Sequence, residues 1–194
     1  MYSSPDGALW VQQSPVPYTP RHSACAVVFN GALYVYSGYS GLGEGGDLND
    51  VWVCTGGELA WKQLAAHAAF PPTYNAGGGV VNGAMFLVGG IVDHIPTNQV
   101  WASHDGQTWV NLGPAPWPER YSPAVVTAGN ALHVMGGAGN NGQVLSDIWM
   151  TTDGKSWTQV AGVEPGVDEL VPTATSDGTT IYVAARSGIW AGRP

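Results

Sequence analysis

The stretch Asn98-Gln99-Val100-Trp101-Ala102-Ser103-His104-Asp105-Gly106-Gln107-Thr108-Trp109 places a tight turn between two tryptophans. Asp105-Gly106 lies midway between Trp101 and Trp109. Asp-Gly supplies the positive φ angles that a tight hairpin turn needs. The stretch therefore predicts two short antiparallel strands, each with an indole to bury.

The same pattern recurs along the chain. It is found at Asp147-Ile148-Trp149 with Asp153-Gly154 and Trp157, and at Asp50-Val51-Trp52 with Gly56-Gly57 and Trp61. Near the N-terminus, Tyr2, Asp6-Gly7 and Trp10 keep the spacing, with tyrosine in place of the first tryptophan. Near the C-terminus only the first half is present, as Gly188-Ile189-Trp190.

A second pair of strands precedes each of these hairpins. Apolar runs begin at Leu33, Met85, Leu132 and Ile181, so they recur about every 50 residues. Each run follows a turn pair: Asn30-Gly31, Asn82-Gly83, Gly129-Asn130 or Asp177-Gly178. Another short strand is expected before each turn, at 24–29, 77–81, 124–127 and 172–176.

One repeat therefore consists of strand a, a tight turn, strand b, a long loop, strand c, a tight turn and strand d. Sheets of this size are not stable alone, but sheets stacked around an axis bury both faces. We predict an all-β fold, a β-propeller of four four-stranded antiparallel blades in a single domain, residues 1–194. The repeats are expected near 20–70, 71–117, 118–166 and 167–194, the last completed by 1–14, so that the N-terminal strand closes the last blade.

Composition supports this class and excludes others. The 28 glycines suit many turns, and no long stretch shows the 3.6-residue period of a helix. The net charge is -8 and the six Lys and Arg residues are scattered, which argues against nucleic acid as a partner. No apolar run is long enough to predict a membrane span. The two cysteines, Cys25 and Cys54, are expected to be buried free thiols.

Two of the repeats resemble a kelch repeat of the galactose-oxidase and kelch superfamily. The third carries Arg120-Tyr121-Ser122-Pro123, Gly136-Gly137, Asp147-Ile148-Trp149 and Trp157; the first carries Arg21-His22-Ser23-Ala24, Tyr34, Gly38, Trp52 and Trp61. The second has Thr73 where arginine is expected, and the last lacks both the arginine and the double glycine. The turn from Ser103 to Trp109 is also similar to the Asp-box of sialidase-type propellers, shortened by one residue.

Three ways of completing the ring are open from the sequence. The chain can close a four-blade ring by itself, and small residues in the innermost strands, such as Gly77-Gly78-Gly79, favour such a narrow ring. Two chains can instead share strands as a head-to-tail homodimer. The sequence can also be a piece of a longer protein.

Strand direction places the d–a and b–c loops together on one face, where binding is expected. The candidate binding residues on these loops are Arg21, Tyr39, Asp93, His94, Trp117, Arg120, Tyr121 and Asn141. Trp117, between two prolines, is expected either to cap the gap between blades or, as an exposed loop indole, to stack on a sugar or anchor a protein partner. The resemblance to kelch repeats also gives Arg21 and Arg120 a second possible role, which is to hold loops at the blade entry.

The leading hypothesis is a non-enzymatic module that binds a protein through the long-loop face, because kelch-like propellers most often have that role. A carbohydrate-binding propeller is the alternative, followed by a structural subunit of a larger assembly. A glycosidase that uses Asp93 and Asp168 is the weakest hypothesis, since the chain has too few arginines for an acidic sugar. The five histidines lack metal-ligand spacing, so no metal and no cofactor is predicted.

Overall fold

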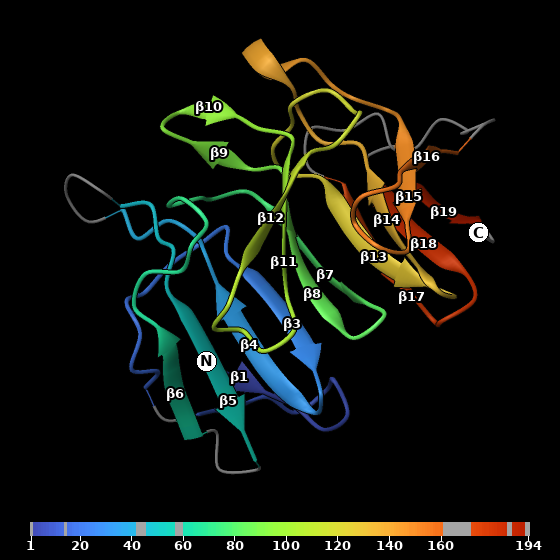
Figure 1. Cartoon of the computed structure of the whole chain (residues 1–194). Helices are drawn as coiled ribbons and strands as arrows, with labels where there is room; N and C mark the ends of the chain where they lie inside the picture. Colours follow the sequence, from blue (N-terminus) through green and yellow to red (C-terminus); the bar gives the residue numbers. More distant parts are fainter. Residues whose placement is uncertain are drawn as a thin grey trace.

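The computed structural model describes residues 2–13, 15–41, 46–56, 60–160, 172–185 and 188–192. Within these ranges the regular structure is β-strand, apart from one 3-10 turn, η1 (Asn140–Gly142). Four sheets fan out around a common axis, each from an innermost strand to an outermost one (Figure 1). The predicted all-β propeller with four blades is therefore confirmed.

Three blades have four antiparallel strands each. Blade 1 contains β3 (Cys25–Phe29), β4 (Ala32–Tyr36), β5 (Val51–Thr55) and β6 (Ala60–Ala65). Blade 2 contains β7 (Gly77–Val81), β8 (Ala84–Val88), β11 (Gln99–Ser103) and β12 (Val110–Pro114). Blade 3 contains β13 (Ala124–Ala128), β14 (Ala131–Met135), β15 (Ile148–Thr151) and β16 (Thr158–Gln159). These strands lie where the repeat pattern predicts strands a to d.

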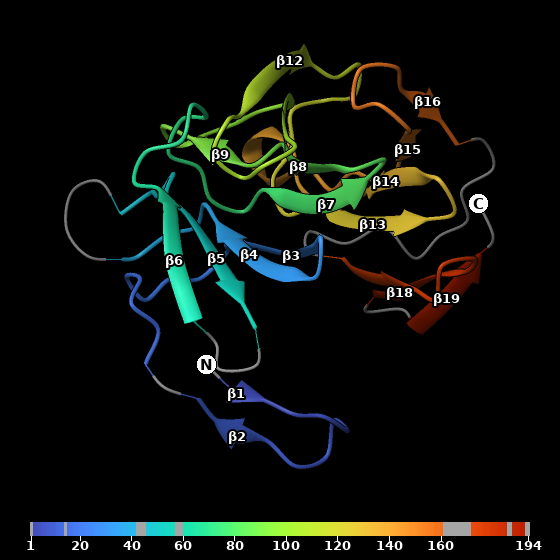
Figure 2. The same ribbon diagram turned by 60° about the horizontal axis from the view of Figure 1, so that its bottom comes forward.

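The fourth blade corrects one prediction. It has three described strands, β17 (Thr173–Ser176), β18 (Ile181–Ala185) and β19 (Gly188–Gly192). The N-terminal strand β2 (Val11–Gln12) was expected to pair with β19, but it pairs with β1 (Tyr2–Ser3). β1 is the extended segment nearest to β2 in the sequence, and the two strands form a hairpin around the turn between them. This hairpin lies apart from blade 4 (Figure 2).

The turns between strands c and d are built by side chains. In blade 2, the Asp105 carboxylate accepts hydrogen bonds from the backbone N–H groups of Gln107 and Thr108, at 2.8 and 2.7 Å. The indole Nε1–H of Trp109 donates to the carbonyl of Gly106 at 3.1 Å, which fixes the ring over the turn. Asp153, Gly154 and Trp157 repeat these bonds in blade 3. A short polar motif thus determines where each strand-d tryptophan points.

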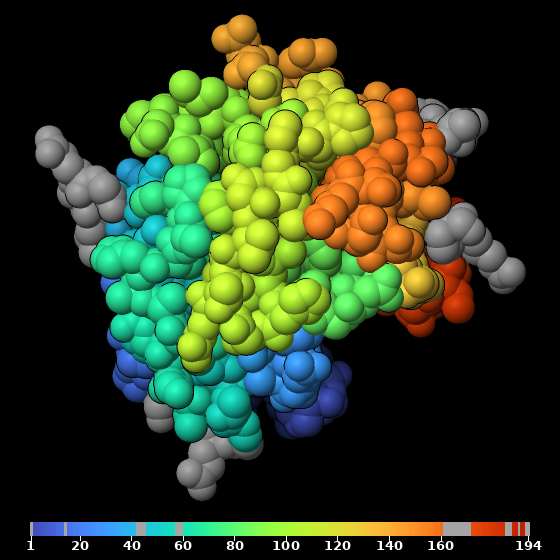
Figure 3. Space-filling model, in the orientation of Figure 1, coloured from blue at the N-terminus to red at the C-terminus, as the bar shows by residue number. Residues whose placement is uncertain are grey.

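Neighbouring blades pack face to face through apolar side chains. Trp109 of blade 2 packs against Tyr36 and Phe70, with ring centroids 5.1 Å apart in both pairs. The Tyr36 hydroxyl donates to the carbonyl of Phe86 at 2.8 Å and so joins blade 1 to blade 2. The surface passes without a break from blade 1 (teal) through blade 2 (yellow-green) to blade 3 (orange) (Figure 3). The two cysteines are buried free thiols, as predicted.

Close to the axis the packing leaves room only for glycine. A Cβ atom at Gly79 would lie 2.3 Å from Leu132 of blade 3, and one at Gly78 would lie 2.8 Å from Cys25 of blade 1. The innermost strands pack in series, β3 on β7, β7 on β13 and β13 on β17. At the two ends of this series, Val28 of β3 is 69% exposed, and Thr173 and Thr175 of β17 are exposed. The described blades therefore form an arc with an opening between blade 4 and blade 1.

Candidate functional site

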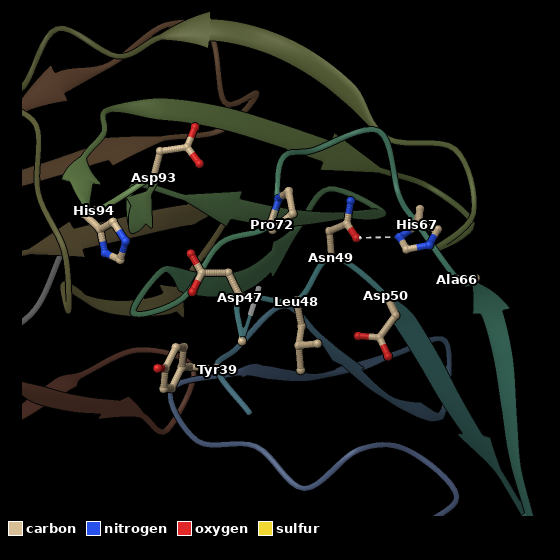
Figure 4. Close-up of a pocket in the computed structure, with 11 residues that line it drawn as sticks. Tyr39, Asp47, Leu48, Asn49, Asp50, Ala66, His67, Pro72, Asp93 and His94 are labelled. Carbon is tan, nitrogen blue, oxygen red and sulfur yellow. Dashed lines mark hydrogen bonds between the residues drawn. The ribbon is translucent and has the colours of Figure 1, made fainter. Parts of the chain in front are cut away.

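An open cavity of about 670 Å³ lies on the long-loop face where loops of blades 1 and 2 meet (Figure 4). Tyr39 and Asp47 come from the b–c loop of blade 1, and Asp93 and His94 come from the corresponding loop of blade 2. This volume is in the range of cavities that bind small molecules or single side chains of a partner. Two repeats about 50 residues apart thus supply its walls.

The Asp93-His94 pair forms the tip of a small hairpin between β9 (Ile91–Val92) and β10 (Ile95–Pro96). Both residues have positive φ, 49° for Asp93 and 66° for His94. A two-residue hairpin turn of this type requires positive φ at both central positions, which usually favours Asn-Gly or Asp-Gly. The turn holds both side chains out at the rim of the cavity, where they are exposed.

Asp47 is half-buried and lies at the centre of the cavity. Its carboxylate points toward the imidazole of His94, whereas the Asp93 carboxylate points away from His94 (Figure 4). Burial raises the pKa of Asp47; the nearby His94 opposes this rise and the negative charge of Asp93 adds to it. Among the described residues, no side chain or backbone N–H donates a hydrogen bond to Asp47 or Asp93.

Tyr39 forms part of the cavity wall and packs against a second tyrosine, Tyr74. The Tyr39 and Tyr74 rings have centroids 5.4 Å apart, and the imidazole of His22 lies 5.3 Å from Tyr39. Burial raises the pKa of Tyr74, with smaller contributions from Asp47, Tyr39 and Tyr121. The ring contacts therefore join His22, Tyr39 and Tyr74 in one aromatic cluster beside the cavity.

The opposite wall is held by a side-chain amide. Asn49 donates through Nδ2 to the carbonyls of Ala68 and Phe70, at 3.2 and 3.1 Å. Its Oδ1 lies 3.2 Å from Nδ1 of His67. Asn98 makes the same pair of backbone bonds in blade 2, to Ala115 and Trp117. The Asn49 amide thus anchors its loop and has no donor left for a ligand.

The two predicted arginines lie below the surface. Arg120 is fully buried and donates to both oxygens of Asp147 at 2.8 Å, and to the carbonyl of Gly136 at 2.9 Å. Arg21 pairs with Asp50 in the same way and donates to the carbonyl of Ser37 at 3.1 Å. Both therefore hold the start of a b–c loop, the second role that the sequence suggested.

Trp117 is 1% exposed, so it is not the exposed loop indole that its neighbouring prolines suggested. Its ring packs against Trp157 at 5.7 Å, and the Arg120 guanidinium lies 5.0 Å from it. Phe70 covers Trp109 in the same manner, and Tyr18 covers Trp61 at 5.0 Å. A signal for this role was present in the sequence. Trp117, Phe70 and Tyr18 each stand three residues before the position of the kelch arginine.

The remaining candidates are spread over the face. Asn141 is exposed within η1, on the loop of blade 3. Asp168, the proposed partner of Asp93 in a glycosidase, lies outside the described residues. The structure thus brings Tyr39, Asp93 and His94 together around Asp47, which was not among the predicted site residues. No group of His, Cys, Asp and Glu in the described part of the chain is arranged to hold a metal ion.

Comparison with known proteins agrees with this architecture. The KLHDC2/KLHL20/DRC7 Kelch-repeats domain matches residues 9–188. The chain belongs to this kelch family. In the third repeat, the kelch arginine Arg120 binds Asp147 and the carbonyl of Gly136, the first residue of the double glycine. The tryptophan Trp149 donates to the same Asp147 carboxylate. No helix in the described ranges is long and apolar enough to cross a membrane.

Several kelch relatives are much longer than this chain. It is 30% identical over 111 residues to the flagellar outer-arm dynein alpha chain of Chlamydomonas reinhardtii, covering 53% of this chain and 2% of that protein. It is 26% identical over 193 residues to leucine-zipper-like transcriptional regulator 1 of Pongo abelii, covering 87% and 22%. The solved structure of YjhT matches with a TM-score of 0.77 at 19% identity, covering 91% of this chain and 62% of that one. The chain thus spans only part of each of these proteins.

Proposed function

We propose that this kelch propeller is a non-enzymatic binding module that takes a basic segment of a protein partner into the long-loop cavity. One observation carries the proposal. Asp47 and Asp93 line an open cavity beside Tyr39, and no described group donates a hydrogen bond to either carboxylate. A Lys or Arg side chain of a partner supplies the missing donors and the missing charge.

The environment of the cavity suits a cation. A Lys or Arg that enters it contacts Asp47 and also the ring of Tyr39. A cation over an aromatic ring contributes about 0.5–2 kcal/mol, depending on how far it is desolvated. The net charge of -8 attracts a basic partner at long range and speeds association.

Other functions have less support. The family and the relatives named as transcriptional regulators favour a protein-interaction role over an enzymatic one. Sugar recognition normally needs free amide groups, and the Asn49 amide in the cavity wall is already bonded to the backbone. The Tyr39 ring in the cavity wall is of a kind that can stack on a sugar, so the test includes glycans.

The test is a selection from random peptides displayed on phage, followed by fluorescence-anisotropy titration of the selected peptides. We expect selection to enrich Lys and Arg, and the Asp47→Asn/Asp93→Asn variant to bind about tenfold more weakly, equivalent to 1.4 kcal/mol. Asn keeps the size of each side chain and removes only its charge, so the fold should be retained.

Glu119→Gln is the matched control, because Glu119 is an exposed carboxylate on the same face and does not line the cavity. It should bind the selected peptides as the wild-type protein does. Selection of peptides without basic residues would contradict the proposal. Equal binding of the selected peptides by the double variant and by the wild-type protein would also contradict it. Binding to a glycan array that depends on Tyr39 would replace it with the carbohydrate-binding function.

A further inference from the structure

His133 places a buried imidazole in the apolar strand β14 of blade 3, with 2% of its surface exposed. Among the described residues, neither Nδ1 nor Nε2 of this ring finds a hydrogen-bond partner. The other four histidines of the chain are exposed. A buried polar group without partners carries a desolvation cost, so this side chain needs an explanation that packing alone does not give.

The His133 ring is turned toward blade 4. Leu132 and Val134, on either side of it in β14, belong to the core that blade 3 shares with blade 2. Side chains alternate along a strand, so His133 points to the opposite face. Val126, its cross-strand neighbour in β13, packs in one cluster with Ile181 of blade 4. His133 therefore lies at the interface between blades 3 and 4.

The described part of this interface holds no charge that could balance an imidazolium. Its core consists of Ala, Val, Ile and Met side chains. The strands β13, β15 and β17 contain no ionisable side chain. On β18, Tyr182 is exposed and alternates with the buried Ile181 and Val183, so it points away from blade 3. Asp177, the charged residue in the described part of blade 4, accepts a hydrogen bond from Tyr182 and is exposed as well.

The environment of the ring favours its neutral form. Burial lowers the pKa of His133, and the backbone groups of Ala131 and Val126 only partly offset this effect. When the ring is exposed to water its pKa returns to about 6.5, so the opened chain binds the proton more readily than the packed one. The stability of this interface is therefore complete above pH 6.5 and is lost as the pH falls below that value.

The interface between blades 3 and 4 is built from smaller side chains than the other two. Trp109 packs on Tyr36 between blades 1 and 2, and Trp117 packs on Trp157 between blades 2 and 3. Among the described side chains, no aromatic pair joins blade 3 to blade 4. The cluster between them is separate from the rest of the core, and β17 packs on β13. Blade 4 can thus open as a unit while the other blades stay packed.

We propose that His133 is a pH-sensitive contact that holds blade 4 on blade 3 near neutral pH and releases it in mild acid. Protonation places a positive charge in an apolar interface, where no described carboxylate receives it. The charged ring regains water only when blade 4 moves away, because burying an unpaired charge is costly. This device is independent of the long-loop cavity, whose residues come from blades 1 and 2.

Hydrogen exchange of the full chain, measured by mass spectrometry at pH 7.5 and 5.5 and corrected for the intrinsic rate, tests this proposal. We expect the equilibrium constant for opening of β17 and β18 to rise up to about tenfold at pH 5.5, because each pH unit between the two pKa values changes it tenfold. Blades 1 and 2 should keep their protection, since the lowered pKa of Asp50 and Asp147 keeps both carboxylates ionised at pH 5.5. His133→Leu should remove the rise, because leucine fits an apolar interface and binds no proton.

His104→Gln is the matched control, because His104 is exposed and lies beside the carbonyl of Gly83, far along the chain from blade 4. It should respond to pH as the wild-type protein does. His133→Gln is a second variant that does not titrate, and it serves if His133→Leu does not fold. It should also lack the rise.

Three results would overturn the proposal. The first is equal protection of β17 and β18 at both pH values in the wild-type protein. The second is a rise that persists in a folded His133 variant, or that is equally large in blades 1 and 2. The third is an NMR titration of the His133 ring with its midpoint at or above 6.5.

Discussion

At the scale of single residues, the Arg120–Asp147 pair shows how one interaction organises a blade. The guanidinium joins the carboxylate of strand c to the carbonyl of Gly136 at the end of strand b, and Asp147 also accepts a hydrogen bond from the Trp149 indole at 2.7 Å. Blade 1 repeats the arrangement with Arg21, Asp50 and Trp52. Blade 2 has Thr73 and Gln99 at the corresponding positions, so both partners are replaced together.

Asp147→Asn should destabilise the protein by about 2–4 kcal/mol, because it leaves the buried Arg120 charge without a counterion. Burial opposes ionisation of Asp147, but hydrogen bonds from Arg120 and Trp149 outweigh it and lower the pKa. The ionised group therefore stabilises the fold above about pH 4, and this contribution is lost as the pH falls through the lowered pKa. Urea unfolding of both proteins near pH 7 and near pH 3 should show the difference shrinking in acid.

Glu119→Gln removes a neighbouring exposed carboxylate and should change the free energy of unfolding by less than about 0.5 kcal/mol. An Asp147→Asn protein as stable as the wild type at neutral pH would show that the pair is not needed to hold the b–c loop.

At the scale of elements, the c–d hairpin is the repeated unit, and its stability depends on what it packs against. The same carboxylate bonds form at Asp6, Asp105 and Asp153. Only the hairpins within blades bury their strand-d tryptophan against a neighbouring blade. Turn geometry is therefore a local property, whereas the contribution of the hairpin to global stability depends on tertiary packing.

Asp105→Ala should lower the free energy of unfolding by about 1–3 kcal/mol, because two backbone N–H groups lose their acceptor under a buried indole. Asp6→Ala removes the same bonds from the unpacked hairpin and is the matched control. It should leave the unfolding of the blades unchanged at concentrations where the chain is monomeric. Differential scanning calorimetry measures both. Equal losses in the two variants would mean that the N-terminal hairpin is packed on a blade.

At the scale of the whole molecule, the curvature of the arc of blades depends on how closely the innermost strands pack around the axis. β7 lies between β3 and β13, and its three glycines leave space for no side chain on either side. The fully buried Leu132 and the β-branched Val125 face Gly79 from blade 3. Curvature of the propeller thus depends on the small size of the residues in its innermost strands.

Gly79→Ala should destabilise the fold by about 1–3 kcal/mol through overpacking between blades 2 and 3. Gly139→Ala is the control, since a Cβ there meets nothing closer than 3.5 Å and the backbone φ of -90° suits alanine. Thermal unfolding followed by circular dichroism compares the two. A Gly79→Ala protein as stable as the Gly139→Ala protein would show that the blades can move apart at the axis.

Much of the fold could be predicted because its signals are local. Asp-Gly and Asn-Gly pairs fix the turns within a few residues, and short continuous apolar runs between turns fix strands such as β8 and β14. The site was predicted less completely. Tyr39, Asp93 and His94 were recognised as residues of the long-loop face, but the repeat pattern gave no reason to place Asp47 between them.

The sequence by itself determined the strands, the turns and the propeller class, because each follows from hydrogen bonds and backbone angles of adjacent residues. Only the tertiary structure decided that β2 pairs with β1 and not with β19, since the choice depends on distance in space. Only it decided that loops of two blades form one acidic cavity beside Tyr39. Such contacts depend on how segments about 50 residues apart pack together, which no local pattern encodes.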